Sequence, residues 1–312
     1  KLDNAIRSMN RKETAGIPVG PAVSNIVCEV ILQNIDYKLE NEFNFVRFVD
    51  DYEAYCNTYE EAESFIRKLS QELMNYKLHI NIKKTEIKNL PQPSANEWVG
   101  KVKEIIPNKR NKLSASEVSK IIDAAIRIQS HHPEGSILKY ALKSISKKLN
   151  SRSMYTFLKY NIKLSFHYPI LIPILVSTFK KLENDPSKNF VDQVVHLLHD
   201  SIEYNRSDSM TWLLYLFKYK NLDLSDQLAK DIIRTEDVLA ISMLSQFNTH
   251  VDKVFSFAND LDKDYPYEID RYWLLLYELY YMDKLKYIYK DNNDNKFFQI
   301  LKQNNINFIH FK

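Results

Sequence analysis

Glycine is the residue that this sequence most clearly lacks. It contains 4 glycines in 312 residues, whereas average usage of ~7% predicts about twenty. All four lie at or before position 135, so the remaining 177 residues contain none. Because β-rich and dinucleotide-binding folds use glycine for positive-φ turns and close backbone approach, we expect neither fold beyond residue 135. The chain therefore divides into two unlike parts.

Cysteine and long apolar runs are also scarce. The two cysteines, Cys28 and Cys56, lack the spacing of a metal-binding motif, and so few thiols are typical of a reducing compartment. No stretch of 18 apolar residues occurs, which predicts that no helix of this sequence spans a membrane.

Charge is balanced overall but uneven along the chain. The formal net charge is +3, yet residues 111–190 carry 13 basic and 5 acidic residues, a net charge of +8. Within this block Lys139, Lys143 and Lys147 recur at four-residue steps, which places them on one helical stripe. Such a stripe suits a phosphate backbone, but it is also typical of an ordinary solvated face.

Apolar spacing in the first 95 residues predicts a mixture of helices and strands. Three- and four-residue steps indicate a helix over 22–40, and β-branched and aromatic residues indicate strands over 43–49 and 52–56. A second helix begins at Thr58, with a capping box completed by a glutamate three residues later. Alternating apolar residues then predict a strand over 78–82. This order is typical of an α+β sheet with helices packed on one face.

From about residue 114 onward the pattern predicts helices alone. Their similar lengths and short connections are typical of an α-solenoid or HEAT-like stack, although an irregular bundle is an alternative because no clean repeat is evident. The predicted helices span 114–130, 134–149, 151–164, 168–183, 187–203, 206–220, 224–246, 249–263, 267–281 and 294–304. We therefore expect domains at 1–95 and 114–312, joined by a linker or thumb start over 96–113.

Two adjacent carboxylates, Asp50 and Asp51, follow an apolar strand and form the predicted turn of the hairpin. Adjacent carboxylates repel each other and are poor strand residues, so stability alone rarely places them there. A divalent cation removes that cost, and carboxylate oxygens suit Mg²⁺, which keeps waters and substrate phosphates in its coordination shell. Taken alone, such a pair is more often an ordinary polar turn than a metal site.

Two further segments change that interpretation. Residues 16–25 read Gly-Ile-Pro-Val-Gly-Pro-Ala-Val-Ser-Asn, residues 48–51 read Phe-Val-Asp-Asp, and residues 78–85 read Leu-His-Ile-Asn-Ile-Lys-Lys-Thr. The first resembles the segment that precedes the catalytic hairpin in the reverse-transcriptase palm. The second resembles that family's aromatic-x-Asp-Asp motif, and the third its Leu-x-x-Asn-x-x-Lys-Thr segment. All three stand in the family's order and at suitable spacing.

The resemblance implies a role for each matching residue. Asp50 matches the carboxylate that binds the catalytic metal ions, and Asp51 matches its partner in the same site. Lys84 matches the basic residue near the leaving pyrophosphate, where an ammonium neutralises developing charge or donates a proton, and Asn81 matches the residue that holds that loop. Contacts to nucleotide or nucleic acid are expected for Gly16, Pro18, Gly20, Ser24, Phe48, Asn81, Lys139, Lys143 and Lys147.

One part of such a palm has no match in this sequence. The family also uses an aspartate on an earlier strand, upstream of the segment that begins at Gly16, and Asp3 does not stand in a strand-like run. The fingers and the nucleotide-gating aromatic would lie upstream as well. We therefore expect either that the N-terminal part of the protein lies outside this sequence or that the palm is degenerate.

The glycine-poor helical half narrows the resemblance to bacterial abortive-infection (Abi-type) and defence-associated reverse transcriptases, whose palm precedes a HEAT-like domain. This implies a cytoplasmic DNA polymerase of anti-phage defence that uses dNTPs and two Mg²⁺ ions, with Mn²⁺ as a substitute, and has DNA and RNA as partners. It also implies a homo-oligomer without a membrane partner, and untemplated or protein-primed synthesis in some members. The alternatives are a catalytically dead palm that serves as a nucleic-acid-binding or oligomerisation scaffold, and a retron- or intron-type reverse transcriptase.

Overall fold

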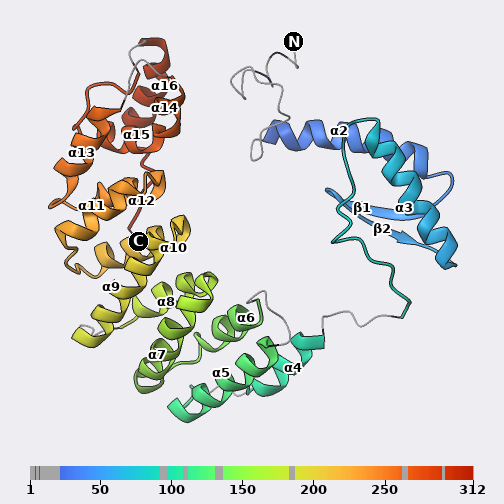
Figure 1. The fold of residues 1–312 in the computed structure, drawn as a ribbon, viewed down its shortest axis with the longest axis horizontal. Coiled ribbons are helices and arrows are strands. Elements are labelled where there is room, and N and C mark those ends of the chain that lie inside the picture. The colour runs from blue at the N-terminus through green and yellow to red at the C-terminus, as the bar shows by residue number, and fades with distance from the viewer. Residues whose placement is uncertain are drawn as a thin grey trace. The chain divides into compact units, whose positions relative to one another are not determined.

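The chain forms two compact units, Lys1–Ser94 and Ala95–Lys312, in the computed structural model (Figure 1). The residues that the structure describes are 4, 7, 22–91, 97–107, 112–130, 136–182, 187–261, 266–289 and 292–311. Within these residues, no helix is long and apolar enough to cross a membrane.

The first unit is a small α+β arrangement. Helix α2 (Ala22–Leu39) is followed by the antiparallel strands β1 (Asn44–Phe48) and β2 (Asp51–Tyr55), and then by helix α3 (Tyr59–Met74). These bounds confirm the two predicted helices and the predicted hairpin. The acidic turn between β1 and β2 therefore has one helix before the hairpin and one after it in the sequence.

The start of α3 follows from its capping residue. The Thr58 side-chain oxygen accepts a hydrogen bond from the Glu61 backbone N–H at 3.1 Å, which satisfies one of the free donors of the first turn. The Glu61 carboxylate accepts from the Asn57 backbone N–H at 2.7 Å. In a full capping box the Glu61 carboxylate would accept from the Thr58 backbone N–H instead. Only half of the predicted box therefore forms.

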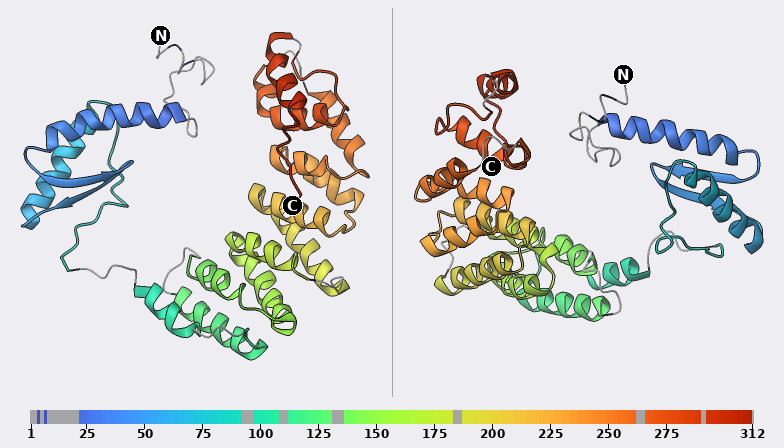
Figure 2. Two further views of the ribbon diagram at one scale, coloured as in Figure 1. Left: turned by 180° about the vertical axis from the view of Figure 1, so that it is seen from behind. Right: turned by 45° about the horizontal axis from the view of Figure 1, so that its top comes forward.

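Both helices pack against one face of the hairpin (Figure 2). The ring centroids of Phe43 and Phe65 lie 5.3 Å apart in an edge-to-face contact, a favourable geometry for two aromatic rings. Burial of each large apolar side chain contributes about 1.5–3 kcal/mol. The buried cluster consists of Leu32, Ile35, Leu39, Phe65, Leu69 and Leu73, against which Phe43, Phe45, Tyr52, Ala54 and Ile80 pack. One face of the hairpin is thus fixed, and the other stays accessible.

Two sequence predictions for this unit were wrong in detail. Residues 78–82 form no strand, and the sheet among the described residues has two strands. A strand needs a hydrogen-bonded neighbour, and here only Ile80 packs on the core while Ile82 is 84% exposed. The hairpin turn consists of Val49 and Asp50 rather than of both aspartates, because Asp51 already pairs with Phe48.

The regular secondary structure of the second unit's described residues is helical, as predicted, apart from an isolated β-bridge between Leu113 and Leu149. Its helices follow one another in a stack, with α5 against α6 and α7, and α10 against α8, α9 and α12 (Figure 2). They are α4 (Glu97–Ile105), α5 (Ala115–Gln129), α6 (Ser136–Ile145), α7 (Ser151–His167), the 3₁₀ turn η1 (Pro169–Leu171), α8 (Ile172–Phe179), α9 (Lys188–Glu203), α10 (Ser207–Tyr219), α11 (Asp226–Arg234), α12 (Val238–Leu244), α13 (Val251–Asp260), α14 (Pro266–Arg271), α15 (Trp273–Tyr281) and α16 (Asn292–Gln303). The HEAT-like character of this stack stays a prediction.

Several helix bounds differ from the sequence prediction, and the helix predicted over 168–183 is the 3₁₀ turn η1 followed by the shorter helix α8. Helix α4 lies in the segment predicted as a linker, where Trp98 and Val102 pack on the core of α5 and α6. The helix predicted over 224–246 is two helices, because Glu236 adopts a left-handed φ of 55° between them. The helix predicted over 267–281 is likewise interrupted, at the buried Tyr272.

Candidate active site

The hairpin presents its residues alternately to two faces, as a strand must. Arg47 and Tyr52 form a cross-strand pair on the face that meets the helices, where the Arg47 side chain is 8% exposed and Tyr52 is half-buried. The next pair toward the turn, Phe48 and Asp51, is exposed on the opposite face. The Phe48 ring is 79% exposed. An aromatic ring and a carboxylate are therefore held beside the turn on an open surface.

The turn itself is conformationally strained. Val49 has a φ of 59°, a left-handed conformation that costs about 1–2 kcal/mol for a residue with a side chain. Two-residue hairpin turns normally use glycine or asparagine at such a position, and a β-branched residue is unusual there. Backbone strain of this kind persists only where the surroundings hold it, and it is concentrated at functional sites.

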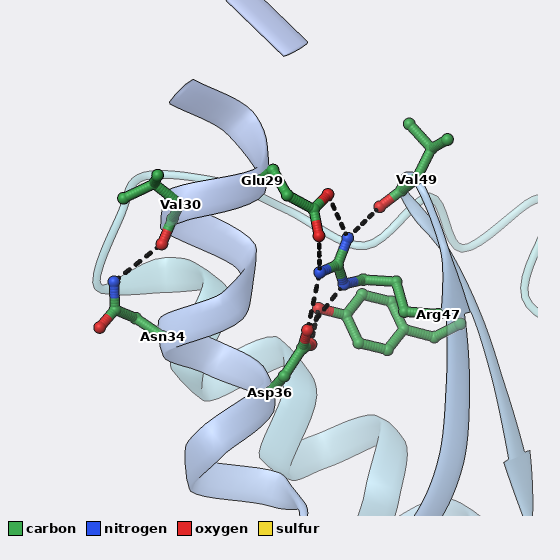
Figure 3. A network of polar contacts seen from close by, with 7 residues as sticks. Glu29, Val30, Asn34, Asp36, Arg47 and Val49 are labelled. Carbon is green, nitrogen blue, oxygen red and sulfur yellow. Dashed lines mark hydrogen bonds and ion pairs between the residues drawn. The ribbon is translucent and has the colours of Figure 1, made fainter. Parts of the chain in front are cut away.

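Arg47 holds this turn against helix α2 (Figure 3). Its Nη1 atom donates to the carbonyl oxygen of Val49 at 2.7 Å. Its Nη1 and Nη2 atoms also bind the two carboxylate oxygens of Glu29, at 2.9 and 2.6 Å, and its Nε atom donates to Asp36 Oδ2 at 2.9 Å. The Tyr52 hydroxyl donates to the other Asp36 oxygen at 2.9 Å. One guanidinium thus joins both acidic residues of α2 to the backbone of the turn.

These contacts shift the protonation equilibria in consistent directions. The hydrogen bonds to Glu29 and Asp36 raise the pKa of Arg47, so its charge is permanent. The same contact with Arg47 lowers the pKa of Glu29. Burial, followed by the hydrogen bond to Asp36, raises the pKa of Tyr52, which keeps its hydroxyl protonated as a donor. At neutral pH Arg47 is therefore charged, and both Arg47 and the Tyr52 hydroxyl donate hydrogen bonds.

The Asp50 and Asp51 carboxylates are exposed and form no hydrogen bond or ion pair with any described residue. Two free adjacent carboxylates are the hard oxygen donors that Mg²⁺ takes, together with waters and phosphate oxygens. The donor chemistry therefore fits the metal ions expected from the sequence. Among the described residues, no group of three or more His, Cys, Asp or Glu could hold a metal ion without outside ligands.

The predicted loop residues are placed beside a compact turn. The Asn81 carbonyl oxygen accepts hydrogen bonds from the backbone N–H of Lys84 at 3.0 Å and from the backbone N–H and hydroxyl of Thr85 at 3.1 and 3.0 Å. Asn81 therefore holds this loop through its backbone. The Lys84 side chain is exposed, and within the described residues it forms no hydrogen bond or ion pair with Asp50 or Asp51.

The residues predicted to touch nucleic acid from the first segment are described only in part. Gly16, Pro18 and Gly20 lie outside the described residues. Ser24 lies in the first turn of α2, where it is 5% exposed and its hydroxyl has no hydrogen-bond partner among the described residues. A buried hydroxyl without a partner is uncommon in proteins.

The predicted lysine stripe is exposed. Lys139 and Lys143 lie on α6 and Lys147 lies two residues beyond its end, and none of the three forms an ion pair with a described residue. The surrounding sequence contains no aspartate or glutamate over 135–182 but nine lysines and arginines. This segment therefore has no acidic side chains of its own to neutralise those charges.

Sequence reasoning assigned no role to the Arg47 network. A signal was available, because Arg47 interrupts an otherwise apolar strand, Phe45 to Val49, and a charge at such a position needs a partner. Glu29 and Asp36 stand seven residues apart, two helical turns, which places them on one face of α2. Only the packing of α2 on the hairpin shows that these residues meet.

Comparison with protein families agrees with the motifs. The model of the family described as reverse transcriptase (RNA-dependent DNA polymerase) matches residues 1–157. The match covers half of the chain and includes α2, the hairpin and α3. No curated protein matches the chain.

Proposed function

Because the chain belongs to the reverse transcriptase (RNA-dependent DNA polymerase) family, we propose that the hairpin turn bearing Asp50 and Asp51 is the polymerisation centre. The observation that supports this most is the combination of two free, exposed carboxylates with a strained turn that a buried arginine holds in place. An ordinary polar turn needs neither the strain nor the buried charge. A metal-binding turn benefits from both, since they fix the carboxylates before the ligand arrives.

The chemistry follows from which groups stand at the turn. Divalent ions such as Mg²⁺, when bound, stabilise the attacking and leaving oxygens of a phosphoryl transfer. Asp50 and Asp51 supply carboxylate oxygens for these ions. Phe48 offers an exposed ring to base or sugar beside Asp51. Lys84 supplies an ammonium that can balance the charge of departing pyrophosphate, once its loop meets the substrate.

The lysine stripe extends the proposal to the helical unit. Lys139, Lys143 and Lys147 would contact the phosphates of a nucleic-acid strand, because they stand in a segment with nine basic and no acidic residues. Neutralising phosphates with free lysines gains free energy through release of counterions. An ordinary solvated face would balance its lysines with neighbouring carboxylates.

The biological role that we propose is anti-phage defence of the abortive-infection type. It is supported by the resemblance of the palm motifs and by the helical unit that follows them, which contains no glycine after position 135. In that setting the protein would use dNTPs, act as a homo-oligomer, and make DNA with or without an RNA template. The scaffold alternative is supported by the small number of metal ligands at the turn. Asp50 and Asp51 supply two carboxylates, and a metal ion there needs a further ligand from outside the described residues.

Asp50→Asn tests the two levels of this proposal together. The purified full-length protein should incorporate labelled dNTPs in the presence of Mg²⁺. Phage should form fewer plaques on cells that express the protein than on cells that do not. Asp50→Asn should abolish both, because an amide oxygen is a weaker metal ligand than a carboxylate. Loss of incorporation with full phage restriction would support the scaffold, and unchanged incorporation would contradict the assigned centre.

A further inference from the structure

The Arg47 side chain is largely shielded from solvent, yet one of its hydrogen bonds is directed at the turn. The side chain is 8% exposed, between helix α2 and the hairpin. Glu29 and Asp36 bind it on the helix side, at 2.6 and 2.8 Å from Nη2. Its Nη1 atom reaches past them to the Val49 carbonyl at 2.7 Å. The peptide that begins with this carbonyl is the one that leads into Asp50.

We propose that Arg47 is a positioning residue for the metal-binding turn. It fixes the Val49–Asp50 peptide by hydrogen-bonding its carbonyl oxygen, and the two carboxylates of α2 fix Arg47 in turn (Figure 3). The direction of the Asp50 carboxylate is thereby set before a metal ion binds. This inference rests on the proposed function, because it concerns the same turn.

The left-handed φ of Val49 explains why the turn needs such a contact. A valine at φ 59° would relax to an ordinary conformation if nothing held its peptide. Cross-strand bonds hold the hairpin up to the pair of Phe48 and Asp51, which leaves the two turn residues beyond the ladder. The Arg47–Val49 hydrogen bond is the contact that reaches into this turn among those of the described residues.

The arrangement requires an arginine. The guanidinium is planar and presents five donors in a fixed fork, so a single group can bind a carboxylate with two parallel bonds and still donate elsewhere. Here it binds both oxygens of Glu29, one oxygen of Asp36 and the Val49 carbonyl. A lysine ammonium in the same place keeps the charge but cannot maintain all these contacts. Arg47→Lys therefore separates charge from geometry.

Glu29 offers a second, milder variant. Its side chain is 58% exposed, so Glu29→Gln leaves no buried charge unpaired, since Arg47 keeps its ion pair with Asp36. It should weaken the hydrogen bonds between Glu29 and Arg47 without unfolding the unit. Arg67 on α3 provides the matched control, because its ion pair with Glu63 is exposed on the same unit and far in sequence from the turn.

The test measures the Mg²⁺ concentration for half-maximal dNTP incorporation, kcat, and the melting temperature of each full-length variant. Arg47→Lys should raise the half-saturating Mg²⁺ concentration and lower kcat. The ratio of kcat to that concentration should fall by about 10–100-fold, the usual effect of losing a residue that orients a metal ligand. Glu29→Gln should also raise the half-saturating Mg²⁺ concentration and lower kcat, by smaller factors than Arg47→Lys. Arg67→Lys should leave both at the wild-type values.

Binding of Mn²⁺, followed by the electron paramagnetic resonance signal of the free ion, gives a readout without catalysis. Wild type should bind Mn²⁺, Asp50→Asn should lose that binding, and Arg47→Lys should weaken it. If wild type binds Mn²⁺ but incorporates no dNTP, the proposed function fails while the Mn²⁺ affinities of the Arg47 and Glu29 variants still decide this inference. A lowered melting temperature with unchanged metal affinity and kcat would overturn it.

Discussion

Glu278 is a carboxyl group that no water reaches, in the helical unit far in sequence from the proposed centre. It is fully buried on α15, where it accepts hydrogen bonds from the Phe308 backbone N–H at 3.1 Å and from Gln246 Nε2 at 3.5 Å. Burial raises its pKa, and the backbone hydrogen bonds from Phe308 and Ile309 oppose that rise only in part. The folded protein therefore binds the Glu278 proton more tightly than the unfolded chain does.

The sign of the resulting pH dependence follows from this difference. The folded state holds the extra proton at acidic pH, so the contribution of Glu278 to the free energy of unfolding declines as the pH rises through its raised pKa. Glu278→Gln keeps an oxygen for the Phe308 N–H and removes the charge. It should raise the melting temperature at pH 7.5 by about 2–4 °C, with the gain vanishing toward pH ~4.5, the ordinary value of a glutamate.

Thermal unfolding of wild type and Glu278→Gln across pH 4–8 checks this prediction. Glu203 on α9 gives a control, because Glu203→Gln changes an exposed carboxylate and should leave the melting temperature within about 1 °C. A uniform loss of stability at every pH would mean that the charged carboxylate is needed for its hydrogen bonds.

At the scale of elements, the missing glycines are replaced by other residues at helix ends. Leu222 N–H donates to the Phe217 carbonyl at 2.9 Å and Arg206 N–H to the Ser201 carbonyl at 2.8 Å, the six-to-one bond that closes a helix through a left-handed residue. The left-handed residues at these two ends are Asn221 and Asn205. The same bond follows the left-handed Asp283 and Asn305, and Lys77 in the first unit, whereas after the left-handed Glu236 the Asp237 N–H donates to Thr235 Oγ1 at 3.2 Å. The glycine-free tail therefore reflects a different choice of residue at the same kind of helix end.

Substitution at these helix ends should change stability by an amount that depends on the residue replaced. Glu236→Gly should raise the free energy of unfolding by about 0.5–1 kcal/mol, because a left-handed residue costs ~1–2 kcal/mol and glycine returns part of that through its unfolded-state entropy. The lost Glu236–Arg271 pair, at 3.5 Å and exposed, matters little. Asn221→Gly should gain less, since asparagine enters this conformation readily. Denaturant unfolding compares the two, and an equal gain or a loss for Glu236→Gly would contradict the account.

The sequence was informative where periodicity and packing agree. The stripe of α2 and the apolar alternation of the hairpin predict the elements that the structure contains. The strand over 78–82 was wrong because its pattern says nothing about whether a neighbouring strand is available. The break at Glu236 was missed because a left-handed glutamate has no sequence signature. In the candidate site, the motif residues were predicted from the sequence and their roles stay predictions. The hydrogen bonds of Arg47 could not be predicted, because they depend on contacts between α2 and the strand.

At the scale of the whole molecule, the unit that bears the proposed polymerisation centre is joined to a helical unit that carries excess positive charge. Replacing Lys139, Lys143 and Lys147 with glutamine should reduce the slope of log affinity against log salt concentration for single-stranded DNA by about 2, at ~0.7 for each lost phosphate contact. Filter binding at several salt concentrations measures the slope. The matched control replaces Lys230, Lys284 and Lys286, exposed lysines of the acidic remainder of the unit. Equal effects of both triple variants would show that the stripe is an ordinary solvated face.

The central claim is that the carboxylates of this hairpin turn serve catalysis, and two neighbours on β2 test it most directly. Asp51 and Glu53 are both exposed on the same face of the strand, two residues apart, but only Asp51 adjoins the turn. The measurement is Mg²⁺-dependent incorporation of labelled dNTPs by full-length Asp51→Asn and Glu53→Gln. We predict a loss of at least about a hundredfold for Asp51→Asn and activity within about twofold of wild type for Glu53→Gln. Wild-type incorporation by Asp51→Asn, or equal loss in both variants, would contradict the account.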